Sequence, residues 1–145
     1  MLKEVLYDMA ISKNLEIKIN NDQATLNEKF YIYQYDKGID LYIKINLSKL
    51  QIVGNSTSLL AELNGGSAGV TILKPNGNVV GRSDLIIADN QVKFTIDATL
   101  TDDLEEVGIY KMQFHLYDES GNRITIPPVS FEVKPLIGIV PDMFK

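Results

Sequence analysis

The chain has 145 residues, of which 45% are hydrophobic and 23% charged, and these values are ordinary for one globular domain. Its 14 lysines and arginines against 19 aspartates and glutamates give a formal net charge of −5. Nucleic-acid binding depends on clustered basic side chains, and the sequence contains no such cluster, so we expect no nucleic-acid partner. The absence of cysteine excludes disulfides, thiolate metal ligands and thiol nucleophiles together.

The two ends of the sequence predict no membrane segment. A secretory signal needs a basic start followed by a long apolar core, whereas Met1–Asp8 contains acids too early. The apolar stretch Leu136–Val140 is far too short to span a bilayer. We therefore expect a soluble protein without a membrane partner, made without a signal peptide.

Residues 1–13 are expected to form an N-terminal segment outside the main domain. Its apolar residues fall at i, i+3, i+4 and i+7, the spacing of an amphipathic helix: Leu2, Val5, Leu6 and Met9. Left exposed, this stripe would be an apolar patch, and such patches usually mark interaction sites. We expect it to contact a partner or another copy, with a fold-back over a sheet edge as the alternative.

Residues 14–135 are predicted to form a β-domain, because alternation of apolar and polar residues is their dominant pattern. Five runs show it: Leu15–Ile19, Leu41–Leu47, Val92–Ile96, Tyr110–Leu116 and Val129–Val133. Successive side chains of a strand point to opposite faces, so each run has one buried and one wetted face. One-sided burial is typical of antiparallel sheets. The pattern predicts an all-β, antiparallel sandwich or barrel.

Turn-forming residues separate the predicted strands. Lys74–Asn78 combines a proline, which presets φ, with Asn-Gly, which tolerates positive φ, and predicts a hairpin. Asp118–Asn122 predicts a second hairpin, and Asp36–Gly38 is a third turn candidate. Residues 48–69 are the least regular, and we expect loops there that flank a short strand near Leu59–Leu63.

One short helical crossover is predicted at Thr99–Gly108. The segment offers threonines as caps, acids in its first turn and a closing glycine. Residues 136–145 follow the last predicted strand as a tail or the start of a linker.

The sequence contains one histidine, His115, and it is the first candidate for a catalytic residue. Alternation places it on the wetted face with Lys111 and Gln113. A Ser-His-Asp triad needs a nucleophile and an orienting acid beside it, and nothing in the sequence singles these out. We expect a solvated histidine on a sheet, no catalytic residue and no enzyme.

Two acidic stretches are candidate calcium sites, and neither fits the spacing of an EF-hand-type loop. The first contains Asp97, Asp102, Asp103, Glu105 and Glu106. The second alternates Asp118, Ser120 and Asn122, but Gly121 stands in the wrong place. We therefore expect no metal site and no bound cofactor.

The most unusual stretch is Phe30–Tyr35. If Phe30 and Ile32 are core residues, Tyr31, Tyr33 and Tyr35 form an exposed row on the opposite face. Tyrosine is enriched at interfaces because it combines a large rigid area with a polar tip. The row is a candidate interface, with simple covering of a sheet end as the alternative.

An ordered series of motifs resembles the N-terminal domain of phage baseplate upper proteins. The series is Gln34–Gly38, Leu73–Val80, Val107–Lys111, Leu116–Ile124 and Val129–Val133. The resemblance implies an immunoglobulin-like sandwich that docks to a tail hub protein or other baseplate proteins and carries receptor-binding parts downstream. It also implies a homo-oligomer in the virion, assembled in the host cytoplasm. A bacterial adhesin or carbohydrate-binding module of the same fold class is the alternative, since fold alone does not specify function.

Overall fold

The structure is a computed structural model that describes residues 11–20, 23–46, 66–88, 91–97, 100, 104–117 and 122–137. The N-terminal stripe and the strand expected near Leu59–Leu63 lie outside these residues. The described strands are β1 (Ile11–Asn20), β2 (Gln23–Leu26), β3 (Tyr31–Tyr33), β4 (Ile39–Asn46), β5 (Ser67–Leu73), β6 (Val79–Ala88), β7 (Gln91–Ile96), β8 (Gly108–Tyr117), β9 (Arg123–Thr125) and β10 (Val129–Lys134). The prediction of an all-β domain is confirmed.

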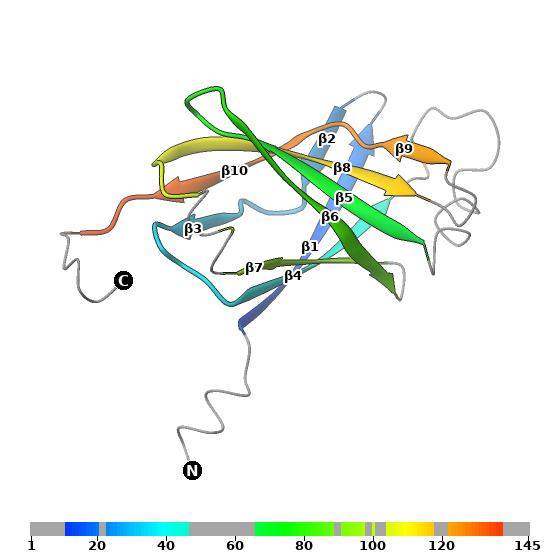
Figure 1. Cartoon of the computed structure of the whole chain (residues 1–145), viewed down its shortest axis with the longest axis horizontal. Helices are drawn as coiled ribbons and strands as arrows, with labels where there is room; N and C mark the ends of the chain where they lie inside the picture. The colour runs from blue at the N-terminus through cyan, green and yellow to red at the C-terminus, as the bar shows by residue number, and fades with distance from the viewer. Residues whose placement is uncertain are drawn as a thin grey trace, which may run out of the picture.

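The strands pair in the order β2-β1-β4-β7-β6-β5-β8-β10-β3, and β9 pairs with β8 (Figure 1). The pairs β1–β4 and β10–β3 are parallel, and the other described pairs are antiparallel. The sheet is therefore mixed, which corrects the expectation of a purely antiparallel one. The reason is that β1 leads directly into the β2 hairpin and β3 returns beside the distant β10, so neither parallel pair is joined by a tight turn.

The sheet curls until its two halves face each other. Phe94 on β7 and Phe114 on β8 are three strands apart in the pairing order, which would separate them by roughly 14 Å in a flat sheet. Their ring centroids are instead 6.2 Å apart, with the rings at 80°. We call β2-β1-β4-β7 the first half and β6-β5-β8-β10-β3, with β9, the second half.

The core lies between the two halves, and the predicted alternation is confirmed in the described residues of all five runs, Leu47 lying outside them. Every second residue is buried, in the sets Leu15, Ile17 and Ile19; Leu41, Ile43 and Ile45; Val92, Phe94 and Ile96; Tyr110, Met112, Phe114 and Leu116; and Val129, Phe131 and Val133. Side-chain burial of this kind stabilises the fold by about 1.5–3 kcal/mol per large residue. The inward residues of both halves thus share one core.

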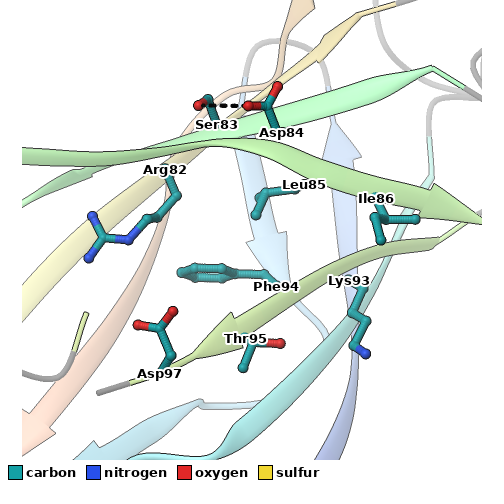
Figure 2. Close-up of a pocket in the computed structure, with 9 residues that line it drawn as sticks. All are labelled: Arg82, Ser83, Asp84, Leu85, Ile86, Lys93, Phe94, Thr95 and Asp97. Atoms are coloured by element: carbon teal, nitrogen blue, oxygen red, sulfur yellow. Dashed lines mark hydrogen bonds between the residues drawn. The ribbon is translucent and has the colours of Figure 1, made fainter. Parts of the chain in front are cut away.

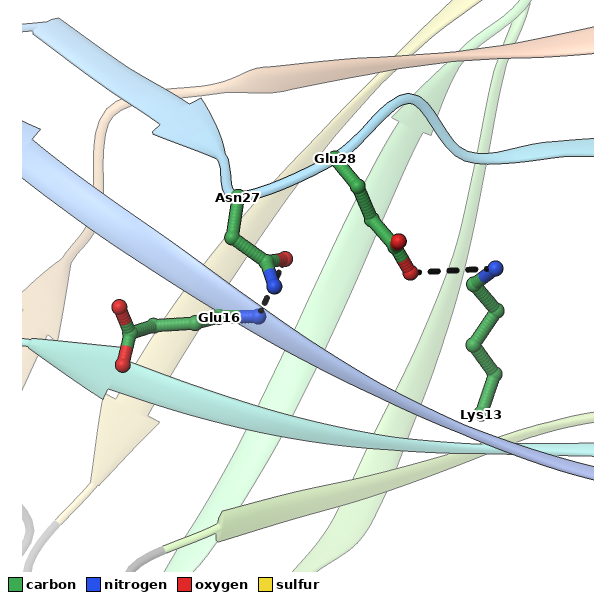
Figure 3. A network of polar contacts seen from close by, with 4 residues as sticks. All are labelled: Lys13, Glu16, Asn27 and Glu28. Atoms are coloured by element: carbon green, nitrogen blue, oxygen red, sulfur yellow. Dashed lines mark hydrogen bonds and ion pairs between the residues drawn. The ribbon is translucent and has the colours of Figure 1, made fainter.

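One side of the curled sheet is closed by the chain between β2 and β3, which passes from the first half to the second. Asn27 extends the β1–β2 ladder, because its side-chain Oδ1 accepts from Glu16 N at 3.0 Å and its own N donates to Glu16 O at 2.9 Å (Figure 3). Lys13 Nζ lies 3.1 Å from Glu28 Oε1 and ties the same connection to β1. The Phe30 ring then packs 6.0 Å from that of Phe131 on β10.

The opposite side is open, because β6 and β7 pair only over Ile86–Ala88 and Gln91–Lys93. Beyond this short ladder β6 follows β5, and β7 follows β4. A bulge bends β6 at this point: Ala68 pairs with Leu85 and Val70 with Arg82, so Gly69 faces two residues, and Asp84 has φ 60°.

The hairpin predicted at Lys74–Asn78 is confirmed between β5 and β6. Lys74 N donates to Asn78 O at 2.8 Å, and Gly77, with φ 91°, donates to Lys74 O at 2.9 Å. Asn78 N donates to Asn76 Oδ1 at 2.9 Å. Near the third turn candidate, Tyr35 with φ 68° and Gly38 with φ 75° reverse the chain before β4. β8 and β9 pair as the second hairpin requires, although residues 118–121 lie outside the described part.

Of the helical crossover predicted at Thr99–Gly108, residues 99 and 101–103 lie outside the described residues, and residues 104–108 are not helical. Leu104 N donates to Leu100 O at 3.1 Å, which closes a single helical turn. Leu100 N donates to Asp97 Oδ1 at 2.8 Å. Gly108, expected to close a helix, is the first residue of β8 and has φ 143°. The sequence therefore predicted correctly that Gly108 has unusual backbone angles, but it wrongly placed this glycine at the end of a helix. No helix in the described residues is long and apolar enough to cross a membrane.

Candidate interaction surface

β3 places two of the predicted tyrosines on the outside of the second half. Phe30 and Ile32 are buried, as the prediction of an exposed tyrosine row required. Tyr31 is 46% exposed and Tyr33 is 42% exposed. The two exposed rings meet edge to face, with centroids 5.8 Å apart. Lys134 Nζ lies 3.9 Å from the centroid of Tyr31, a cation–π contact that holds this ring in place.

β3 ends the pairing order and is closed by its own chain. Asp36 Oδ2 accepts from Tyr33 N at 3.0 Å, and Asp36 N donates to Tyr33 O at 3.1 Å. Capping an edge strand in this way prevents another strand from pairing there. Contacts at this edge are therefore expected to involve the tyrosine side chains. Tyr35 lies in the turn after β3 and does not continue the strand row.

The exposed tyrosines belong to a larger apolar surface that sequence reasoning did not assemble. Strand register aligns it: Leu73 pairs with Val79 across β5 and β6, and Ile109 on β8 faces Glu132 on β10, which faces Tyr31. We define the outer apolar patch as Tyr31, Tyr33, Leu73, Val79, Val107 and Ile109. It contains most of the exposed large hydrophobic residues in the described part of the chain, of which the others are Ile11, Ile86 and Ile137.

A signal for the patch was present in the alternating runs. Ile109 precedes Tyr110 at the start of β8 and has the parity of Lys111, so alternation alone assigns it to the outer face. Leu73 likewise follows the buried Ile72. What the sequence lacked was the register that brings β3, β5, β6 and β8 to one end of the same face. In Figure 1 this is the end where β8 begins and β10 finishes.

Basic side chains lie within the patch. Lys111 pairs in register with Leu73, and Lys134 with Tyr33, while Glu132 stands between Ile109 and Tyr31. Among the described residues, the ion pair is formed by Lys13 on β1 and Glu28 after β2, and neither residue belongs to the patch. The patch thus combines apolar side chains with two lysines and one glutamate, on a chain whose net charge is −5.

His115 lies on the outer face of β8, as alternation predicted, at the other end from the patch. Its Nε2 is 3.0 Å from Thr71 Oγ1 on β5, and its Nδ1 is 3.0 Å from Thr125 Oγ1 on β9. Burial, with the nearby Arg123 charge adding to it, lowers the pKa of His115 below its usual 6.5. The imidazole therefore joins three strands through neutral hydroxyl groups, and no acid in this arrangement orients it for catalysis.

The acids that were weighed as calcium ligands have structural contacts where they are described. Asp97 accepts from the Leu100 backbone, and Glu106 Oε2 accepts from Asn76 N at 3.3 Å. The Glu106 carbonyl accepts from the Tyr110 hydroxyl, and burial, followed by the Glu106 charge, raises the pKa of Tyr110 to about 12. Asp102, Asp103, Asp118 and Ser120 lie outside the described residues. No group of three or more metal-ligating side chains occurs among the residues that the structure describes.

A cavity of about 310 Å³ occupies the open side between β6 and β7. In Figure 2, Arg82 and Leu85 from β6 and Phe94 and Asp97 from the β7 side point into the space between the strands. The lining combines the buried Phe94 ring with charges of both signs at the rim. This volume is at the lower end of the range for ligand pockets, which runs from about 300 to 1,000 Å³.

Comparison with known proteins yields a structural match. No family model matches the chain, and no curated protein matches it. Among solved structures, the chain is similar to the "N-terminal domain of phage TP901-1 ORF48", with a TM-score of 0.51 and 13% sequence identity. The match covers 86% of this chain and 98% of that chain. At this identity it shows a shared fold.

Proposed function

We propose that the chain is a non-enzymatic structural domain of a phage virion that docks to a neighbouring tail protein through the outer apolar patch. The observation that carries the docking role is the clustering of exposed Tyr31, Tyr33, Leu73, Val79, Val107 and Ile109 on one end of one face. Soluble monomers rarely leave a large contiguous apolar surface uncovered. Aromatic residues with interspersed cations are typical of the centre of protein interfaces.

Two independent observations support the phage assignment. The ordered motifs resemble the N-terminal domain of baseplate upper proteins, and the fold is similar to a domain of a phage protein. The baseplate location, a hub protein as partner, further copies of the chain and downstream receptor-binding parts belong to this proposal. So does the immunoglobulin-like arrangement, which the two facing halves support and the two parallel strand pairs modify.

A sugar-binding role is less well supported by the patch. The Lys134 ammonium covers one face of the Tyr31 ring, and the Tyr31 and Tyr33 rings meet edge to face. The two tyrosines therefore do not form a flat stacking platform.

Antibody labelling of the parent phage tests the proposal. Negative-stain images with an antibody against this chain should show label at the tail tip. Absence of label from intact tails, with label on the isolated protein as control, would overturn it.

A further inference from the structure

We propose that the neighbouring protein at the outer apolar patch is a second copy of this chain, held by a two-fold contact between the β10 strands of the two copies. This inference rests on the proposed function and names the partner that the patch accepts. A surface that contacts its own copy across a two-fold axis must be self-complementary, because residue i meets residue j of the partner and j meets i. The arrangement of side chains on β8, β10 and β3 meets this requirement.

The outer face at this end of the sheet carries two neighbouring rows of the same composition. Each row has one aliphatic residue, one charged residue and one tyrosine, in the order that strand pairing sets. The first row is Ile109, Glu132 and Tyr31, and the second row is Val107, Lys134 and Tyr33. Val107 belongs to the second row because it precedes Gly108, which pairs with Val133. The two rows therefore differ mainly in the sign of the charge at their centre.

A two-fold axis that crosses the strands between the two rows places each residue opposite its counterpart. The rows are two residues apart along each strand, which is about 7 Å. Rotation about this axis brings Glu132 over Lys134 of the partner copy, and Tyr31 over Tyr33 of the partner copy. An axis along β10 would instead bring Glu132 over Glu132 of the partner copy, and like charges that face each other across an interface are costly. The charges thus select one of the two orientations.

The charged side chains of both rows are available for this contact. Glu132 and Lys134 are half-buried, and neither forms an ion pair with another residue in the described part of the chain. The Lys134 ammonium lies 3.9 Å from the centroid of the Tyr31 ring, which holds it over the outer face. Each two-fold contact would contain the pair of Glu132 and Lys134 twice. The aliphatic and tyrosine side chains beside each pair would exclude water and strengthen the attraction.

The overall charge of the chain favours this surface for self-association. Two copies with a net charge of −5 each repel one another in most orientations. The two rows together carry one acid and one base, so copies that meet here match unlike charges. A partner with a strong charge of one sign would gain little from rows of opposite sign.

Charge exchange between the rows tests the proposal by sedimentation equilibrium of the full chain. The natural chain should show a monomer–dimer equilibrium. Glu132→Lys alone and Lys134→Glu alone should each raise the dimer dissociation constant at least about tenfold, because like charges then face each other twice. An equimolar mixture of the two variants should recover dimerisation, since unlike charges face each other again in the mixed pair. The double variant E132K with K134E should dimerise like the natural chain for the same reason.

Glu16→Lys on the first half of the sheet is the matched control. Glu16 is also half-buried, and it pairs in register with a base, Lys44 on β4. The substitution reverses one charge of a cross-strand pair away from the patch, with the same change in net charge as Glu132→Lys. It should leave the dimer dissociation constant unchanged within about twofold.

Two results would overturn the proposal: a natural chain that stays monomeric at every concentration reached, or a mixture of the two single variants that dimerises no better than either alone. Neither result bears on whether the chain is a tail protein, which the antibody labelling decides separately. Label at the tail tip together with a monomeric chain would show that the patch docks to a different tail protein.

Discussion

The outer faces of the two halves of the sheet differ in chemistry. On the first half, outward residues engage one another across strands: Thr95 Oγ1 donates to Asp40 Oδ1 at 2.7 Å, and Lys93 Nζ lies 5.9 Å from the Tyr42 ring centroid. On the second half, one end of the outer face is apolar and exposed. Both faces belong to strands with the same inward alternation, so alternation assigns residues to a face without saying what the face is for. Cross-strand polar pairing is typical of a face in contact with water, whereas the apolar patch is the surface through which the proposed docking would occur.

The largest expected effect follows from removing the patch. Tyr31→Ser combined with Ile109→Ser should weaken docking to the tail partner at least about 100-fold, since each buried side chain contributes about 1.5–3 kcal/mol. The control Lys44→Ser with Lys93→Ser changes exposed residues of the first half and should leave docking unchanged. Incorporation of each variant into tail particles, or binding to the purified partner, measures the difference. Equal losses in both variants would remove the distinction between the two faces.

The backbone beneath the patch is expected to be the next most sensitive feature. Gly108 has φ 143°, and a Cβ there would lie 2.9 Å from Pro75 Cγ. Gly108→Ala should therefore lower the free energy of unfolding by about 1–3 kcal/mol. Gly38 has φ 75° with nothing within 4 Å of such a Cβ, so Gly38→Ala should cost less. Urea unfolding of both variants decides whether the close contact adds to the backbone strain.

A smaller effect is expected on the polar face of the first half. Thr95→Val removes the hydrogen bond to Asp40 while keeping the side-chain shape, and should cost about 1 kcal/mol. Thr25→Val on β2 makes the same change at an exposed threonine for which the described residues provide no side-chain partner. It should change the free energy of unfolding by less than about 0.5 kcal/mol. A matching loss at Thr25 would show that the Asp40 contact contributes nothing specific.

The smallest effect concerns pH at the polar end of the second half. Because the pKa of His115 is lower in the folded chain than its usual 6.5, the unfolded chain takes up the proton first as pH falls. Its contribution to stability is complete above pH 6.5 and decreases as pH falls from 6.5 toward the lowered value. The urea midpoint should therefore drop between pH 7.5 and pH 5.5, and His115→Gln should reduce that drop. An identical drop in the variant would assign the pH dependence to other groups.

The sequence by itself determined the five alternating strands, their inward faces and the hairpin at Lys74–Asn78. Each of these depends on neighbours in the chain: alternation with period two places Phe94 and Phe114 in the core, and Pro75 with Gly77 presets the turn. It also identified Tyr31 and Tyr33 as exposed once Phe30 and Ile32 were taken as core.

Only the tertiary structure decided which strands lie side by side, and therefore which exposed residues act together. The parallel pairing of β3 with β10 brings Tyr31 into the row of Ile109, although 78 positions separate them in the sequence. The same pairing order leaves the part of β6 before Ile86 apart from β7 and opens the cavity. Register across distant strands arises from how the whole core packs, and a local pattern of apolar and polar residues contains no record of it.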